Sequence, residues 1–140
     1  MPRFEPNPDR RPAVVTGASS GIGRATAVAL AALGHPVVLG ARRLDECEAA
    51  AAAIRQDGGE AVAVHLDLAD GDSVAQFAKA AVDVVGEVEI VVSNAGLNMA
   101  GSVLDTDAGA LDGVLAVNIV GNRDSVDRTT LMKWITTLLK

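Results

Sequence analysis

Short apolar runs rich in β-branched residues alternate along the chain with longer, alanine-rich segments whose apolar residues recur at helical spacing. This alternation is typical of βαβ units, in which parallel strands buried on both faces are joined by helices. Four runs predict four strands, at residues 13–16, 36–40, 61–66 and 89–93. The pattern therefore predicts an α/β fold built on one parallel sheet.

The segments between and after these runs predict four helices. Gly34 is the expected stop of the first helix, and the third has Asp72 as its expected N-cap and Gly86 as its C-terminal glycine. The first helix is expected to begin within residues 20–23 and to run to Leu33, and the next two are expected at 44–56 and 72–86. A fourth helix is expected to start near Asp105 or Thr106 and to carry Leu111, Val114, Leu115 and Asn118. Helical spacing places Ile22, Ala25, Ala29 and Leu33 on one face of the first helix, and gives Val74, Phe77, Ala78, Ala81 and Val85 as the apolar stripe of the third.

The stretch TGASSGIG, residues 16–23, lies between the first strand and the first helix. Gly17 would permit a sharp turn, Gly21 would let the backbone approach a pyrophosphate, and Gly23 would let the helix pack closely on the strand. The N-terminus of the helix would then face the negative charge of the ligand. Taken alone, the pattern fits a glycine-rich turn without a ligand about equally well.

Four further motifs follow in order: GARR at 40–43, LDL at 66–68, NAG at 94–96 and VNIVG at 117–121. With these motifs the chain closely resembles the short-chain dehydrogenase/reductase family over about residues 12–121. The resemblance implies a Rossmann-type, doubly wound parallel sheet, incomplete here, with about four strands in the order 3-2-1-4. It also implies an oxidoreductase that transfers a hydride between a nicotinamide and a carbonyl or alcohol substrate.

The resemblance also implies a cofactor site. The glycine loop would hold the pyrophosphate, Asp67 and Leu68 would border the adenine, and residues 94–96 would steady the sheet beside the cofactor. Asn118 matches the family position whose backbone arrangement supports a water in the proton relay, although on the residues alone it is equally an ordinary polar residue of a helix. The candidate cofactor-binding residues are Gly17, Ser19, Ser20, Gly21, Ile22, Gly23, Arg42, Asp67, Leu68, Asn94, Ala95 and Gly96, and the candidate catalytic residue is Asn118.

The end of the second strand bears on the choice of cofactor. A carboxylate there would bind the free ribose 2′-hydroxyl of NAD, whereas an arginine would accept the 2′-phosphate of NADP. Ala41 stands where the acid would be, and Arg42 follows it. Because a guanidinium pairs well with phosphate, NADP is favoured over NAD. The alternative is that Arg42 and Arg43 are solvated charges at the start of a helix.

The family mechanism needs a serine and a Tyr-x-x-x-Lys pair beyond the Asn118 region, and the 140 residues contain no tyrosine. Thr129 with Lys133 has the same spacing, as does Thr136 with Lys140, but an aliphatic hydroxyl is too weak an acid for that proton transfer. We therefore expect the cofactor-binding part of an oxidoreductase, truncated before its catalytic residues and inactive as given. The alternatives are a non-catalytic nucleotide-binding or interaction module and an unstable product without function.

Charge and composition exclude several other classes. A net charge of −6 without a basic cluster disfavours nucleic acid and anionic membranes, and no apolar run approaches the roughly 18 residues of a membrane span. His35 and His65 lack partners at metal-binding spacing, so no metal site is expected. Cys47 has no second cysteine to pair with and is expected to be a small buried hydrophobe. A cytoplasmic protein is expected.

The chain is expected to have three parts. Residues 1–12 form a loose arm, residues 13–121 the NAD(P)-binding portion, and residues 122–140 a divergent tail. The tail is expected to form an amphipathic helix, because its apolar residues recur at helical spacing: Leu131, Trp134, Ile135, Leu138 and Leu139. A sheet that ends at the fourth strand would have an exposed edge. We expect either that the tail helix covers this edge or that the chain self-associates through it.

Overall fold

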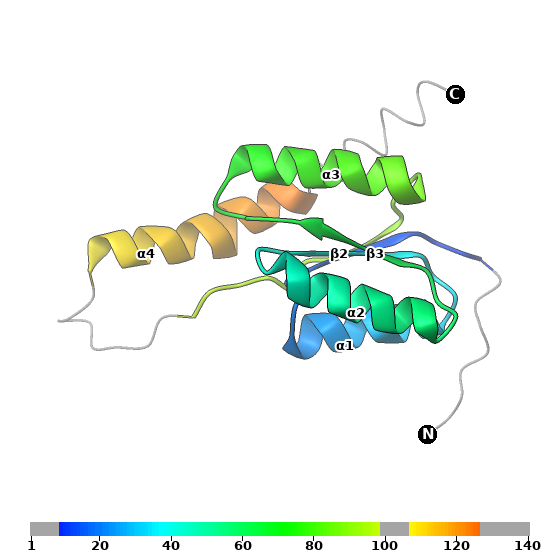
Figure 1. Cartoon of the computed structure of the whole chain (residues 1–140). Helices are drawn as coiled ribbons and strands as arrows, with labels where there is room; N and C mark the ends of the chain where they lie inside the picture. Colours follow the sequence, from blue (N-terminus) through cyan, green and yellow to red (C-terminus); the bar gives the residue numbers. More distant parts are fainter. Residues whose placement is uncertain (1–8, 99–106, 127–140) are drawn as a thin grey trace.

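A computed structural model describes residues 9–98 and 107–126 of the chain (Figure 1). In chain order its elements are β1 (Ala13–Thr16), α1 (Gly21–Ala32), β2 (Val37–Ala41), α2 (Leu44–Gln56), β3 (Ala61–His65), α3 (Gly71–Val85), β4 (Ile90–Val92), α4 (Ala108–Leu115) and the π-helical segment η2 (Ala116–Gly121). Helical conformation continues beyond η2 through residues 122–126. The predicted α/β class is confirmed.

The four strands form one parallel sheet in the order β3-β2-β1-β4, as predicted. Val14 of β1 lies opposite Val38 of β2 on one side and Val91 of β4 on the other. The strand bounds differ from the predicted ones by one residue at most. For example, β2 begins at Val37 because Pro36 has no N–H to donate to a neighbouring strand.

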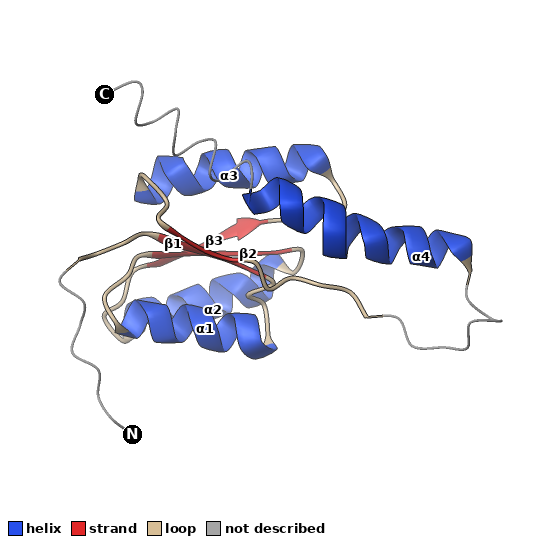
Figure 2. Ribbon diagram, turned by 180° about the vertical axis from the view of Figure 1, so that it is seen from behind, coloured by secondary structure: helices blue, strands red, loops and turns tan. Residues whose placement is uncertain are grey.

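Helices cover both faces of the sheet, which is the arrangement of a doubly wound fold (Figures 1 and 2). Helices α1 and α2 pack on one face against side chains such as Val15 and Leu39. Helix α3 packs on the other face, where Phe77 contacts the cluster that contains Val14 and Val38. Because successive strand residues point to opposite faces, strands made of apolar residues supply both clusters. The predicted apolar face of α3 is thus confirmed.

The buried face of α1 is not the predicted one. Its buried residues are Gly23, Ala27 and Ala31, whereas Ile22 is 79% exposed. The side chains that face the sheet are the smallest in the helix, and they let its backbone approach the strands closely. Gly23 packs where a Cβ would contact Gly17 and Asn94, so the face of α1 that carries Gly23 is the one that meets the sheet.

Two predicted helix starts need correction. The N-cap of α3 is Asp70 rather than Asp72, since the Asp70 carboxylate accepts a hydrogen bond from the backbone N–H of Asp72 at 2.9 Å. Helix α4 starts at Ala108, after Asp107, whose carboxylate accepts from the N–H of Ala110 at 3.1 Å. Asp105 and Thr106 lie outside the described residues, as do residues 1–8 of the predicted arm and residues 127–140, which contain the apolar stripe of the predicted tail helix.

Cys47 is fully buried in the cluster under α2, as expected. None of the helices within the described ranges is both long and apolar enough to cross a membrane. Across residues 9–98 and 107–126, no three His, Cys, Asp or Glu side chains gather in a way that could hold a metal ion. The Nδ1 atom of His35 instead accepts a hydrogen bond from the backbone N–H of Arg11 at 3.2 Å.

Candidate functional site

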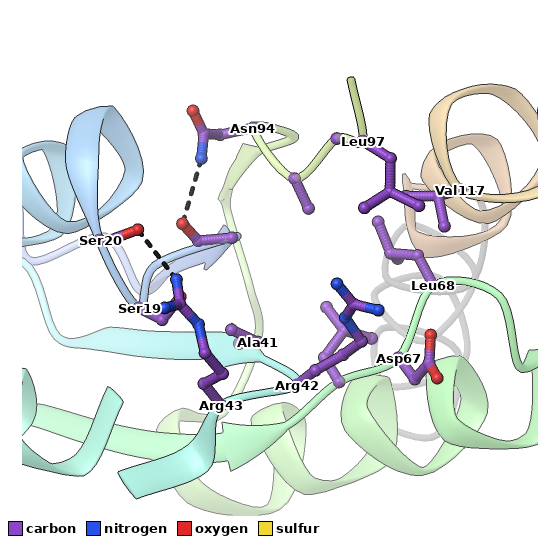
Figure 3. Close-up of a pocket in the computed structure, with 15 residues that line it drawn as sticks. Ser19, Ser20, Ala41, Arg42, Arg43, Asp67, Leu68, Asn94, Leu97 and Val117 are labelled. Atoms are coloured by element: carbon purple, nitrogen blue, oxygen red, sulfur yellow. Dashed lines mark hydrogen bonds between the residues drawn. The ribbon is translucent and has the colours of Figure 1, made fainter. Parts of the chain in front are cut away.

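An open cavity of about 470 Å³ lies at the carboxyl ends of β1, β2 and β4 (Figure 3). In the strand order the chain passes from β3, at one edge of the sheet, to β4 on the other side of β1, and such a switch point is where α/β sheets bind ligands. The residues around the cavity come from the glycine loop, the end of β2, the segments that follow β3 and β4, and η2. They are Gly17, Ser19, Ser20, Gly40, Ala41, Arg42, Arg43, Leu66, Asp67, Leu68, Asn94, Ala95, Gly96, Leu97 and Val117.

The ends of β1 and β4 are tied together by Thr16, which is almost fully buried. Its hydroxyl oxygen accepts hydrogen bonds from the backbone N–H groups of Asn94 and Ala95, each at 3.0 Å. In return the Asn94 side-chain amide donates to the carbonyl oxygens of Thr16 at 3.1 Å and Gly17 at 3.3 Å. These bonds hold the segment 94–97, which forms one wall of the cavity, against the glycine loop.

Two glycines let the backbone of the glycine loop turn sharply and pack closely against α1 and Asn94. Gly17 has a φ of +67°, a conformation that favours glycine. A Cβ at Gly23 would contact both the Gly17 carbonyl oxygen and the Asn94 amide nitrogen, so only glycine fits there. The Ser20 side chain makes no capping hydrogen bond at the start of α1, and no acidic residue lies in the first turn. The first N–H groups of α1 are therefore not neutralised by these side chains, which suits an anionic ligand.

Two guanidinium groups reach the cavity from the end of β2. Arg43 donates to the hydroxyls of Ser19 and Ser20, at 3.1 Å each, and to the Glu46 carboxylate at 2.9 Å. Figure 3 shows Arg42 turned instead toward the open middle of the cavity, on the side of Asp67. Arg42 has no ion pair with any described residue. The Arg42 guanidinium next to Ala41 thus faces the cavity without a carboxylate within ion-pair distance among the described residues.

The Asp67 carboxylate is engaged by the backbone. Its Oδ1 accepts from the N–H of Ala69 at 3.0 Å, and its own N–H donates to the buried hydroxyl of Ser73 at 2.9 Å. The turn after β3 is therefore fixed by local hydrogen bonds, and it presents Asp67 and Leu68 to the cavity.

Asn118 does not line the cavity but holds a residue that does. Its Oδ1 accepts from the backbone N–H of Leu97 at 2.7 Å, and its Nδ2 donates to the carbonyl oxygen of the same residue at 2.8 Å. Asn118 lies in η2, and π-helical turns are frequent at functional sites. Both polar ends of the Asn118 side chain thus bind the backbone of the cavity wall.

Of the residues predicted from the sequence, nine line the cavity: Gly17, Ser19, Ser20, Arg42, Asp67, Leu68, Asn94, Ala95 and Gly96. Gly21, Ile22, Gly23 and Asn118 do not line it. Thr16 and Asn122, which support the wall, were not among the predicted site residues. Nor were six of the lining residues: Gly40, Ala41, Arg43, Leu66, Leu97 and Val117. Arg43 and Thr16 stand inside the quoted motifs GARR and TGASSGIG, whereas nothing in the sequence singles out Asn122.

Comparison with known proteins relates most of the chain to one family. The family model described as short chain dehydrogenase matches residues 11–128. The chain is 39% identical over 110 residues to a 3-oxoacyl-acyl-carrier-protein reductase of Synechocystis, which covers 78% of this chain and 44% of that protein. It is 38% identical over 114 residues to an uncharacterized oxidoreductase of Bacillus subtilis, covering 81% of this chain and 42% of the relative.

Solved structures give the same result. An alcohol dehydrogenase from the archaeon Thermococcus sibiricus, complexed with 5-hydroxy-NADP, matches with a TM-score of 0.83 and 36% identity over 86% of this chain and 52% of that one. A short chain dehydrogenase/reductase from Burkholderia phymatum in complex with NAD matches with a TM-score of 0.83 and 31% identity, over 93% of this chain and 45% of that one. The chain thus spans about half the length of these relatives.

Proposed function

The chain belongs to the short-chain dehydrogenase family, and from this premise we propose that it is the NADP-binding part of an oxidoreductase. The reaction of the whole enzyme would be hydride transfer between the cofactor and a carbonyl or alcohol substrate. The nicotinamide, when bound, supplies the carbon that gives or accepts the hydride. The glycine loop would hold the pyrophosphate, and the turn with Asp67 and Leu68 would border the adenine. The open cavity, which Gly17, Asp67 and Leu68 help to line, fits such a ligand.

The observation that carries the choice of NADP is the charge at the end of β2. Arg42 faces the cavity without a carboxylate partner among the described residues, and the neighbouring Ala41 offers no acceptor for a free ribose 2′-hydroxyl. Arg43 lies beside it and already donates to the two serine hydroxyls of the glycine loop. A phosphate at this point would therefore meet guanidinium and hydroxyl donors together.

Nucleotide titration calorimetry with Arg42→Ala tests the proposal. We expect the Kd for NADP to rise about tenfold or more, with little change for NAD, because only NADP carries the 2′-phosphate. Arg10→Ala is the matched control, since Arg10 loses the same charge but pairs with Glu60 away from the cavity. Equal affinity of the parent chain for NAD and NADP, or an Arg42→Ala variant that binds NADP as well as the parent, would contradict the choice.

We further propose that the 140 residues bind the nucleotide without turning over a substrate. They contain no tyrosine, the residue that exchanges a proton with the substrate oxygen in the mechanism that the resemblance implies. The same absence favours a second candidate function, a non-catalytic nucleotide-binding or interaction module. Absorbance at the NADPH band during incubation with ketones, aldehydes and alcohols is the measurement. Steady turnover that Arg42→Ala abolishes would contradict this proposal.

The outer edge of β4 supports a proposal of self-association. Within the described part of the chain β4 pairs with β1 alone, and all three of its residues are half-buried. An exposed parallel edge offers free backbone groups to another chain. Sedimentation velocity should then show a mass that rises with protein concentration, and a monomer at every concentration would refute the proposal.

A further inference from the structure

Asn122 makes the same kind of contact as Asn118, four residues further along the helix. Its Nδ2 donates to the carbonyl oxygens of Ala95 at 2.9 Å, Val117 at 3.1 Å and Asn118 at 3.4 Å. Its Oδ1 accepts from the Ser93 hydroxyl at 2.8 Å. Residues i and i+4 lie on the same face of a helix, so the two asparagines meet the same segment of chain. Asn118 holds Leu97, and Asn122 holds Ala95 and Ser93.

The contact with Ala95 means that both backbone polar groups of this cavity-wall residue, which belong to two successive peptide groups, have partners. The N–H of Ala95 is held by the Thr16 hydroxyl at 3.0 Å, and its carbonyl oxygen is held by Asn122. Strand β4 ends at Val92, so the sheet ladder does not reach this carbonyl. The wall is thus fastened to β1 on one side and to the helix on the other.

We propose that Asn122 is a positioning residue of the dinucleotide site, which acts by holding the Ala95 carbonyl and with it the wall formed by residues 94–97. The identity of the ligand in this inference rests on the proposed function, whereas the hydrogen bonds between Asn122 and the wall do not depend on it. A ligand that stays at the Arg42 end of the cavity, such as 2′,5′-ADP, should not depend on Asn122. A ligand that extends along the strand ends to the wall, such as NADP, should.

Three variants separate the contacts of Asn122. Asn122→Ala removes all of them, and Asn122→Asp keeps the volume and the acceptor for Ser93 but turns a carboxylate oxygen toward three carbonyl oxygens. Ser93→Ala is the matched control, because it removes the bond to Oδ1 and leaves the donor to Ala95 in place. If the amide donor positions the wall, the aspartate variant should be worse than the alanine variant. If Asn122 only fills space, the order should be the reverse.

Hydrogen exchange at the backbone amides of Ala95 and Leu97 is the first readout, and it needs no ligand. We expect exchange to quicken in the order parent, Asn122→Ala, Asn122→Asp, with Ser93→Ala close to the parent. Calorimetry is the second readout, in which the Kd for NADP should rise about fivefold in Asn122→Ala and about tenfold in Asn122→Asp. The Kd for 2′,5′-ADP should stay within about twofold in both variants, since removing one hydrogen bond away from the fragment leaves its contacts unchanged.

The outcomes separate this inference from the proposed function. If the parent chain binds neither nucleotide, the proposed function fails, and the exchange data alone decide the role of Asn122. Unchanged exchange at both amides in the two Asn122 variants would overturn the inference. Equal losses for NADP and 2′,5′-ADP that follow the loss of stability in urea would overturn it too, because they would show a structural role only. Should Asn122→Asp fail to fold, hydrogen exchange in Asn122→Ala and Ser93→Ala is compared instead. Faster exchange at Ala95 and Leu97 in Asn122→Ala alone would support the inference, and equal exchange in the two variants would overturn it.

Discussion

Replacing Thr16 with valine would test whether one hydroxyl joins the end of β1 to the cavity wall. The two side chains have nearly the same shape, so the variant keeps the packing and loses the hydroxyl. Thr16 is 1% exposed, and its Oγ1 accepts from the N–H groups of Asn94 and Ala95 at 3.0 Å each, while donating to the Val92 carbonyl oxygen at 3.5 Å. In the valine variant both N–H groups lose their acceptor.

The expected size follows from those two donors. A buried polar group left without a partner costs about 1–3 kcal/mol. Asn94 and Ala95 are half-buried, so water can reach part of this region and the cost per donor falls in the lower half of that range. We expect Thr16→Val to lower the free energy of unfolding by about 2–4 kcal/mol, a large share of the roughly 5–15 kcal/mol that stabilises a typical domain.

Urea unfolding followed by circular dichroism measures this loss, and Thr16→Ser is the matched control. Serine keeps the hydroxyl and loses one methyl group, which costs about 0.5–1.5 kcal/mol in a core. The serine variant should therefore be more stable than the valine variant, although it buries less apolar surface. A valine variant as stable as the serine variant would refute the reasoning, since it would show that the hydroxyl does not hold the wall.

The remaining predictions concern stability. Asp70→Ala should lower the free energy of unfolding by about 0.5–2 kcal/mol through loss of the N-cap, and a larger loss for Asp72→Ala in the same urea titration would contradict the cap assignment. Gly23→Ala should cost about 1–3 kcal/mol because its Cβ would contact the Gly17 carbonyl, whereas Gly71→Ala meets open space and should cost nothing measurable. Burial, with a smaller effect from the neighbouring Glu46, raises the pKa of the Cys47 thiol above its ordinary value of 9.0. The unfolded thiol therefore ionises first, and the free energy of unfolding should fall as pH rises above that value, less steeply in Cys47→Ala. Iodoacetamide should label the native thiol more slowly than the unfolded one, and equal rates would refute its burial.

Local patterns were sufficient to predict which segments form the strands of the sheet. Strands buried on both faces need continuous apolar, β-branched runs, and such runs are visible in the sequence whatever lies around them. The glycines of TGASSGIG and the arginine after Ala41 stand next to their strands, so their place at one end of the sheet follows from chain order alone. The other predicted lining residues, Asp67, Leu68 and residues 94–96, came from the resemblance of their motifs to the short-chain dehydrogenase/reductase family.

Other features depend on which segments meet in space. Thr16 binds residues 78 and 79 positions away, and Asn122 binds Ala95 27 positions away, so no local period shows either contact. The same holds for α1, where the close approach of Gly23 to Gly17 and Asn94 goes with burial of the face of Gly23, Ala27 and Ala31. The sequence alone therefore determined the elements, their order and the glycine loop, because these follow from short-range sterics and burial periodicity. Only the tertiary structure decided which side chains hold the cavity wall, because hydrogen bonds of this kind require donors and acceptors that the fold brings within about 3 Å of each other.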